Sequence, residues 1–293
     1  MIRTPGADGW MGRVLGLYLV LFFVYMFGPL VIMTLAAFND TPYPTVTMWE
    51  GWTFRWFGAL FSNREMWLAI QNSVVIGAGA MLLSVPCGLA GALLLTRMRL
   101  SKTSRNVIYG VLVSPVLAPG ILLGISTLIF WQNFGIGGGM GLAMVAQTSF
   151  ISAYCMLLFM ARLQRFDATL EEAALDLGAT HTQVFRRILL PFLRPVILTA
   201  CVLAFLQSLE NYNTTVFAIG GGRTMMIEIA SNVRHGLTPM VNALAVVLIG
   251  CTVVLAFAYE IHRRIELKRV GRRVSAARAA DEKLSRNPVL QPA

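Results

Sequence analysis

The sequence predicts an all-α integral membrane protein with six transmembrane helices and both termini in the cytoplasm. Three observations predict this class. Hydrophobic residues make up 56% of the 293 residues and charged residues only 13%, about half the charged share of an ordinary soluble domain. The apolar residues gather in long continuous stretches, and the basic residues fall between these stretches on alternate sides. A soluble chain of this length could not bury so much apolar surface, so soluble, disordered and disulfide-rich secreted proteins are excluded.

Six stretches are long enough to cross a bilayer as helices, which takes about 20 apolar residues. The predicted spans are residues 14–38, 71–95, 106–131, 142–161, 195–219 and 241–261. Their apolar runs are continuous, which argues against the alternating strands of a membrane barrel. The first run is too long for a cleaved signal peptide and contains Pro29, so it is predicted to remain as a helix.

The basic residues give the orientation. The N-terminus (1–13), the turn after the second span, the loop 162–194 and the tail 262–293 hold 2, 4, 5 and 9 of them, 20 in total. The opposite side holds four, which are Arg55, Arg64, Arg223 and Arg234. Because basic loops stay in the cytoplasm, both termini are placed there, flanking a six-span domain at 14–261. The charge that sets the orientation in the membrane, together with attraction to anionic lipids, accounts for the net charge of +10 without any nucleic acid.

Two spans carry residues that predict how the helices pack. The second span has a small residue at every fourth position, which suits close contact with a neighbouring helix in lipid. These residues are Ala80, Ser84, Gly88 and Ala92. The third span combines prolines and glycines, which favour a kink. These are Pro115, Pro119, Gly120 and Gly124.

The sequence contains no catalytic or metal-binding pattern. The four cysteines and three histidines are far apart, so neither a disulfide framework nor a metal site is predicted. The motifs of zinc proteases, serine hydrolases, redox dithiols and P-loop ATPases do not occur. The glycine-rich run 135–141 lacks the spacing of a dinucleotide loop and is predicted to be a flexible turn. We therefore expect no cofactor and no enzymatic activity in this chain.

The cytoplasmic loop 162–194 is the most informative segment. Glu172 stands near the start of a helix-prone stretch, where a carboxylate favours the positive end of the helix dipole. Gly178 is a natural helix stop. A second short helix with an apolar side is predicted to follow and to end at Pro191, and Pro195 is predicted to open the fifth span. A helix-turn-helix at the membrane face, with an apolar knob flanked by charges, suits the docking of another protein.

This loop resembles the E-A-A loop of the permease subunits of bacterial ATP-binding-cassette (ABC) importers. The family pattern is E-A-A, three residues, G, nine residues, then I-x-L-P. The residues at its fixed positions are Glu172, Ala173, Ala174, Gly178, Ile188, Leu190 and Pro191. All seven match at the family's spacing and fall in the corresponding loop, so the resemblance is specific.

The resemblance covers roughly residues 10–265. The aromatic segment 52–57 and the segment 239–244 look like the polyamine branch of the family, and in particular like the second permease of spermidine/putrescine systems. The resemblance implies the type I importer permease fold, with a cytoplasmic coupling helix in the loop 162–194.

For function, the resemblance implies a pathway through the bacterial inner membrane for a small cationic solute, with a polyamine as the first candidate. The implied partners are two ATPase subunits, a second permease that is expected to be a different chain, and a periplasmic or lipid-anchored solute-binding protein. Glu172 would pair with a basic group on the ATPase, or it would only cap its own helix. The alternatives are a permease for an aminophosphonate, ferric iron or another organic solute, a secondary transporter or channel, and an intramembrane enzyme.

One carboxylate falls inside a predicted span. Glu210 lies about 15 residues into the fifth span, where an ionised group is costly and marks a functional site by default. On a continuous helix it would share one polar stripe with Gln207, Asn211 and Thr214. No Lys or Arg lies inside any span to neutralise it, so a cationic substrate would suit it; the alternative is a hydrogen-bonded structural carboxylate. The polyamine branch often has two adjacent acids here, whereas this chain has Glu210 and Asn211, so the exact substrate stays open.

Overall fold

The structure is a computed structural model that describes residues 8–236, 238–254, 257, 260–261 and 264. Apart from residue 264, the predicted basic tail lies outside these described residues. Within them the regular elements are helices, with a single isolated bridge between Asn39 and Trp52, in agreement with the predicted all-α class. The chain divides into two compact units, Met1–Leu60 with Leu237–Ala293, and Phe61–Gly236.

The first unit contains α1 (Asp8–Ala37), most of α2 (Arg55–Ser62) and the helical residues Pro239–Val254. The loop after α1 is organised by the buried side chain of Asn39. Its amide nitrogen donates to the carbonyl oxygens of Thr45 and Met48 at 2.9 and 2.7 Å. Trp52, Phe54 and Phe57 pack around Phe38, with ring centroids 5.1–6.1 Å from its own.

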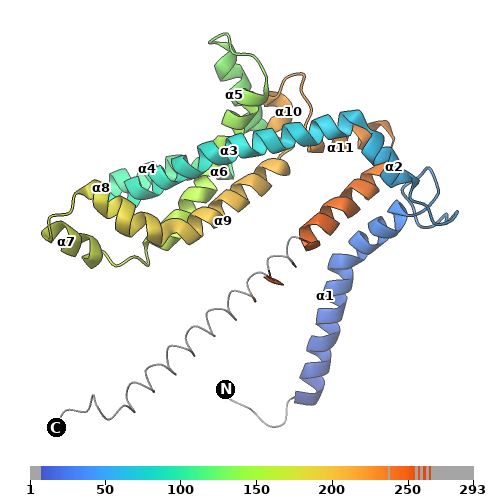
Figure 1. Cartoon of the computed structure of the whole chain (residues 1–293), viewed down its shortest axis with the longest axis horizontal. Coiled ribbons are helices and arrows are strands. Elements are labelled where there is room, and N and C mark those ends of the chain that lie inside the picture. The colour runs from blue at the N-terminus through green and yellow to red at the C-terminus, as the bar shows by residue number, and fades with distance from the viewer. Residues whose placement is uncertain (1–7, 237, 255–256, 258–259, 262–263, 265–293) are drawn as a thin grey trace, which may run out of the picture. The chain divides into compact units, whose positions relative to one another are not determined.

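The second unit is built on α3 (Arg64–Arg97), α6 (Met140–Leu163) and α9 (Leu190–Leu209), which lie side by side in Figure 1. Ile151, Phe159 and Leu193 are fully buried between them. The small residues predicted to form a packing stripe on α3 are all buried. A Cβ atom on Gly88 would lie 2.5 Å from the Cβ atom of Cys155, so the predicted close contact of this stripe with a neighbouring helix is confirmed.

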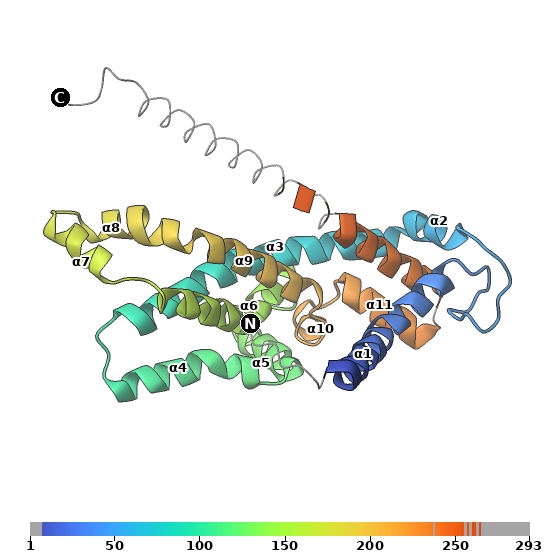
Figure 2. The same ribbon diagram turned by 90° about the horizontal axis from the view of Figure 1, so that it is seen from below.

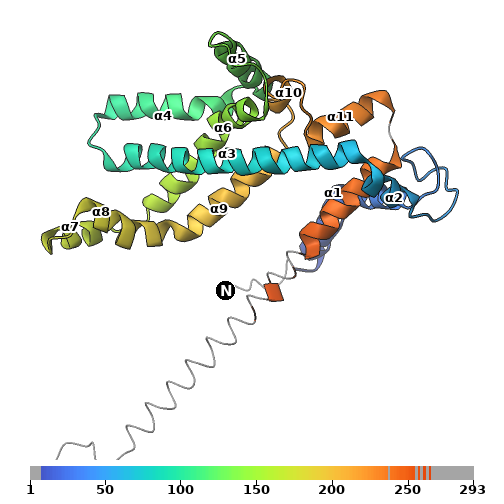
Figure 3. The ribbon, with the colours of Figure 1, turned by 45° about the horizontal axis from the view of Figure 1, so that its top comes forward.

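The third predicted span is broken rather than kinked. The chain bends by 106° between α4 (Lys102–Leu117) and α5 (Gly120–Gln132), and Figure 3 shows α5 turning away from the direction of α4. Ala118 adopts an extended conformation, with φ −79° and ψ 140°, because the residue before a proline is disfavoured in the α region. Pro119 then precedes the first turn of α5.

The fifth predicted span differs from the structure at both ends. One apolar helical stretch runs from His181 to Leu209, through α8 (His181–Val184), a π-turn (Phe185–Leu189) and α9. Figure 2 shows this stretch as one ribbon. The predictions that Pro191 ends a short helix and that Pro195 opens the span are therefore wrong. The π-turn interrupts the α-helical bonding directly before Pro191, so its missing N–H costs little there.

The two ends of the second unit hold different loops. α7 (Thr169–Asp176) and α8 lie at the same end as the turn between α3 and α4 (Figure 1). These are two of the segments predicted to be cytoplasmic. α10 (Thr215–Ala218) and α11 (Met225–His235) lie away from that end. The run 135–141 is more than a flexible turn, because Gly139 donates its N–H to the carbonyl oxygen of Ala218 at 3.0 Å.

In the part of the chain that the structure describes, four helices are long and apolar enough to cross a membrane, or five if the bent pair α4–α5 counts as one span. The helix of residues Pro239–Val254 is shorter. The number of six spans therefore stays a prediction.

Candidate functional site

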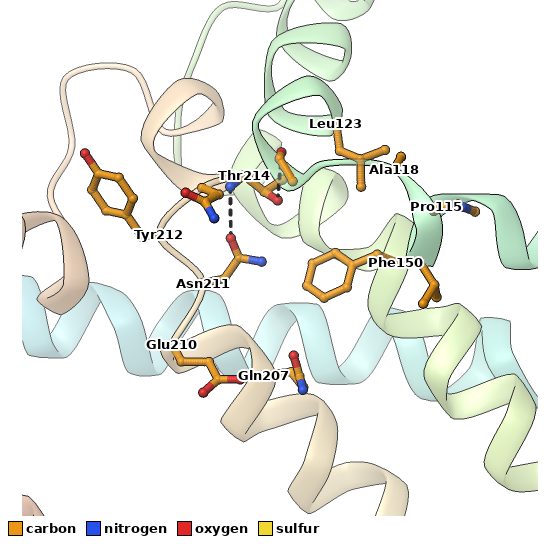
Figure 4. A pocket seen from close by; sticks show the side chains of 12 residues that line it. Pro115, Ala118, Leu123, Phe150, Gln207, Glu210, Asn211, Tyr212 and Thr214 are labelled. Atoms are coloured by element: carbon orange, nitrogen blue, oxygen red, sulfur yellow. Dashed lines mark hydrogen bonds between the residues drawn. The ribbon is translucent and has the colours of Figure 1, made fainter.

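A cavity of about 320 Å³ opens where the α4–α5 break, α6 and the segment after α9 meet. This volume is within the usual range of ligand sites, about 300–1,000 Å³. All four residues predicted to face the substrate pathway line it: Gln207, Glu210, Asn211 and Thr214. Figure 4 shows Phe150 of α6 and Tyr212 among the other side chains of the lining.

The four residues line the same cavity, but they do not lie on one continuous helix as predicted. α9 ends at Leu209, and the chain leaves the helix at Glu210. The side chain of Asn211 accepts a hydrogen bond from the N–H of Thr214 at 3.0 Å (Figure 4). Asparagine and threonine side chains compete in this way with the backbone bonds of a helix. The prediction that these residues form a polar stripe on one helix is thus wrong. They line the same cavity because the chain turns after Leu209.

The Glu210 carboxylate has no partner in the described chain. It is exposed, and no hydrogen bond or ion pair joins it to another described residue. Arg234 donates to the hydroxyl oxygen of Tyr212 at 3.0 Å, and Arg234 itself is not part of the cavity lining. A free carboxylate, neutral amides and aromatic rings form a site that suits an ammonium group, which binds carboxylates and ring faces.

Two glycines of α5 allow the turn to approach. A Cβ atom on Gly124 would lie 2.5 Å from the carbonyl oxygen of Thr214. The hydroxyl of Thr214 donates to the carbonyl oxygen of Gly120 at 3.2 Å (Figure 4). The glycines that were predicted to favour a kink therefore also bring α5 against the segment after α9.

The sequence did not predict the role of Gln147, whose side-chain amide bonds both the end of α9 and the start of α10. Gln147 is buried on α6, with 1% of its surface exposed. Its amide nitrogen donates to the hydroxyl oxygen of Thr215 at 2.6 Å, and its amide oxygen accepts from the hydroxyl of Ser208. The available signal was a polar amide in the middle of an apolar span, where its hydrogen bonds must be met inside the protein.

We expect Gln147→Leu to lower the thermal stability of the protein. The change takes the amide partner from the buried hydroxyl groups of Ser208 and Thr215, of which Thr215 keeps a 3.5 Å bond to Asn211. A buried group left without its hydrogen bond costs about 1–3 kcal/mol. Thermal unfolding in detergent, followed by intrinsic fluorescence, measures the effect. Gln132→Leu, at an exposed position on α5, is the matched control. Equal unfolding temperatures for the two variants would contradict the role of this network.

The first half of the E-A-A pattern forms an exposed helical turn. Glu172, Ala173 and Gly178 are exposed. Gly178 has φ +85°, which a side chain disfavours, and it ends α7 as predicted. Its N–H donates to the carbonyl oxygen of Leu175, and that of Ala179 to Ala174, at 2.9 and 3.0 Å. This pair of bonds is the Schellman motif of helix ends.

Two apolar side chains stand out beside this turn. Leu170 is 53% exposed and Leu177 is 88% exposed. They lie seven residues apart, which is two helical turns and places them on the same side of α7. Exposed leucines next to charged residues are typical of a protein-protein contact.

The second half of the pattern packs inward. Ile188, Leu190 and Pro191 are half-buried, and they flank the buried side chains of Leu189 and Leu193. The pattern residues of α7 and Gly178 thus form an exposed turn, whereas Ile188, Leu190 and Pro191 pack at the junction of the π-turn and α9.

An ion pair anchors α7 to α3. A nitrogen of the Arg97 guanidinium lies 3.0 Å from a carboxylate oxygen of Glu171. The Arg97 guanidinium also stacks on the ring of Phe166, 5.1 Å from its centroid. Phe166 packs edge-on against Phe192, at 4.9 Å, and Arg162 lies 3.9 Å over the Phe192 ring. The cluster joins the loop to α3, α6 and α9.

The start of α7 is held by Asp167. Its carboxylate accepts hydrogen bonds from the hydroxyl and the N–H of Thr169, at 2.8 and 3.0 Å. These bonds favour the ionised form and lower the pKa of Asp167 below its usual value. The side chain of Glu172, by contrast, forms no hydrogen bond or ion pair with a described residue. The alternative that Glu172 caps its own helix therefore has no bond to support it.

We expect the neighbouring carboxylates of α7 to respond differently to the same change. Glu171→Gln removes the ion pair with Arg97, which at this exposure stabilises by about 0.5–1 kcal/mol, and amide exchange in α7 rises about two- to fivefold. Glu172→Gln removes no side-chain bond to a described residue and should leave the exchange unchanged. Hydrogen-exchange mass spectrometry of the two variants measures this. Equal exchange in both would argue against the anchor.

The chain matches known proteins over most of its length. Residues 80–267 match the family described as binding-protein-dependent transport system inner membrane component. The chain is 32% identical over 260 residues to the putrescine transport system permease protein PotI of Escherichia coli K12, across 86% of this chain and 92% of that protein. It is 27% identical over 260 residues to the spermidine/putrescine transport system permease protein PotC of the same strain, across 88% and 97%.

Solved structures show the same fold. One is the crystal structure of a bacterial ABC transporter involved in the import of the acidic polysaccharide alginate, with a TM-score of 0.66 and 18% identity, across 88% of this chain and 96% of that chain. Another is an amino acid ABC transporter crystallised with histidines, with a TM-score of 0.53 and 18% identity, across 71% and 97%.

Proposed function

This chain belongs to the family of binding-protein-dependent transport system inner membrane components, the permease subunits of ABC importers, and we propose that it forms the pathway for a small cationic solute of the putrescine or spermidine type. The observation that carries the proposal is the cavity at the end of α9, where the Glu210 carboxylate has no partner among the described residues. A diamine or polyamine supplies the missing positive charge.

The proposed topology has six spans with both termini in the cytoplasm. It is supported by the long apolar helices, by the distribution of basic residues and by the position of α7 beside the turn between α3 and α4 (Figure 3). With this topology α7 faces the side where ATP is available.

The proposed coupling uses the exposed turn of the E-A-A pattern. Glu172, Ala173 and Gly178 are accessible to a partner, and Leu177 is the most exposed apolar side chain beside them. In the proposed complex each of two separate ATPase subunits binds the coupling helix of one permease, and a second permease completes the pathway. A solute-binding protein delivers the substrate from the outer side. ATP hydrolysis takes place on the ATPase chains.

The cavity favours a cation over an aminophosphonate. Its lining holds one carboxylate and no Lys or Arg, whereas an aminophosphonate calls for basic groups. The similar permeases PotI and PotC are named for putrescine and spermidine transport, which supports a cationic substrate. Because Asn211 stands where a second acid is common, the alternative within this proposal is a different small cationic or organic solute.

Reconstitution tests the proposal. The chain is co-expressed with its ATPase and partner permease, purified in mild detergent, and placed in liposomes together with the solute-binding protein. Labelled putrescine should enter only with ATP, and unlabelled spermidine should compete. Uptake without the ATPase subunits would instead indicate a secondary transporter, and competition by a neutral sugar alone would overturn the substrate class.

A further inference from the structure

A second cavity lies at the α7 end of the second unit, away from Glu210. It measures about 380 Å³ and opens between the end of α3, the first turn of α4 and the end of α6. Leu95, Met160 and Leu163 form an apolar part of its wall. Arg97 and Arg105 line it as well, so the cavity combines an apolar surface with two guanidinium groups.

The two arginines have bonding capacity left. No hydrogen bond or ion pair joins the side chain of Arg105 to another described residue. Arg97 uses one terminal nitrogen for Glu171, and its Nε atom is buried without a hydrogen-bond partner. A buried donor without an acceptor is rare in proteins and calls for an explanation. No Asp or Glu lines the cavity, so an anion is the ligand that complements it.

The position of the cavity favours the phosphate of a membrane lipid over a soluble anion. α3 and α6 end at this cavity after apolar runs of membrane length, and lipid head groups lie at that depth. Guanidinium groups bind phosphate oxygens through several N–H donors at once. An apolar wall next to them suits the start of an acyl chain, which a soluble phosphate lacks. Basic pockets between transmembrane helices bind anionic head groups in this way.

We propose that this cavity binds the phosphate of an anionic phospholipid, with Arg97 and Arg105 as its ligands and the lipid chain against Leu95 and Leu163. Arg97 then serves two acceptors, the lipid phosphate and the Glu171 carboxylate of α7. The lipid therefore binds directly beside the anchor of α7. This inference does not depend on which solute crosses the membrane.

The test measures binding of phosphatidylglycerol to the full chain, purified in detergent in the assembly that it forms. Native mass spectrometry counts the retained lipid, and a titration followed by the unfolding temperature gives the affinity. Arg105→Gln should weaken binding about tenfold, the effect of one lost charge-assisted contact. Arg99→Gln is the matched control, because Arg99 is exposed in the same turn and does not line the cavity. It should bind like the unchanged protein.

Further comparisons decide between sources of the anion. Phosphatidylcholine should stabilise less than phosphatidylglycerol, and inorganic phosphate at millimolar concentration should not displace the lipid. Displacement by phosphate would assign the site to a soluble anion and overturn the proposal. Equal losses in Arg99→Gln and Arg105→Gln would also overturn it, since they would show general surface attraction. If Arg105→Gln does not fold, Arg105→Lys is measured instead: it keeps the charge but loses the forked donors of the guanidinium, so it should retain only part of the binding.

Discussion

Gly178→Asp is expected to abolish ATP-driven uptake while the chain remains in the membrane. Gly178 ends α7 with φ +85°, a conformation that costs other residues about 1–2 kcal/mol. The added carboxylate would also stand at the negative end of the helix dipole, where it is unfavourable. Nothing lies within 4 Å of a Cβ atom placed there, so the change disturbs the turn and its exposed surface rather than the core of the permease.

The measurements are uptake in proteoliposomes, ATPase recovery in a pull-down, and the amount of chain in the membrane. We expect ATPase recovery to fall at least about tenfold, from the strain in the turn together with the repulsive charge. Gly178→Asn is the control for charge, because asparagine tolerates positive φ better than most residues; it should keep intermediate activity. Normal uptake by Gly178→Asp with normal ATPase association would rule out docking through this turn.

Glu210→Gln is expected to lower putrescine uptake by about ten- to a hundredfold at low substrate concentration, the loss of one charge-assisted contact of about 1.5–3 kcal/mol. The substitution keeps the shape of the side chain and removes only its charge. Because Glu210 has no partner among the described residues, the fold loses no described bond. The unfolding temperature should therefore stay the same while uptake falls.

Glu50→Gln makes the same chemical change at an exposed position of the loop after α1, outside the cavity lining. It should transport normally. The concentration dependence of uptake and the substrate-stimulated ATPase rate are measured for both variants. If both quantities are unchanged in Glu210→Gln, the carboxylate is structural and the substrate is recognised elsewhere.

The parts of the fold that could be predicted are those determined by local sequence. Gly88 predicted a close helix contact because only small residues permit one, and a Cβ atom there would collide with α6. Gly178 predicted the end of α7 because glycine favours positive φ. In both cases one residue type is nearly required by the backbone, so the sequence carries the information directly.

The parts that could not be predicted depend on distant partners. Leu209 ends α9 although apolar residues continue beyond the polar segment, because the side chain of Asn211 bonds the backbone of Thr214 and Gln147 holds Ser208 from another helix. The ion pair of Arg97 and Glu171 joins residues far apart in the sequence. Each of these contacts exists only after the helices pack, so periodicity alone does not contain it.

α8, the π-turn and α9 form one continuous helical stretch, so a movement at its first residue can be transmitted to its last. The 29 residues from His181 to Leu209 form a lever arm of roughly 43 Å at about 1.5 Å per residue. Tilting such an arm by about 5° moves its far end by about 4 Å, comparable to the width of a methylene chain. Since Glu210 follows the last residue of this helix, in the proposed mechanism a small movement at the ATPase-binding end would be long enough to open or close the cavity around a slender solute.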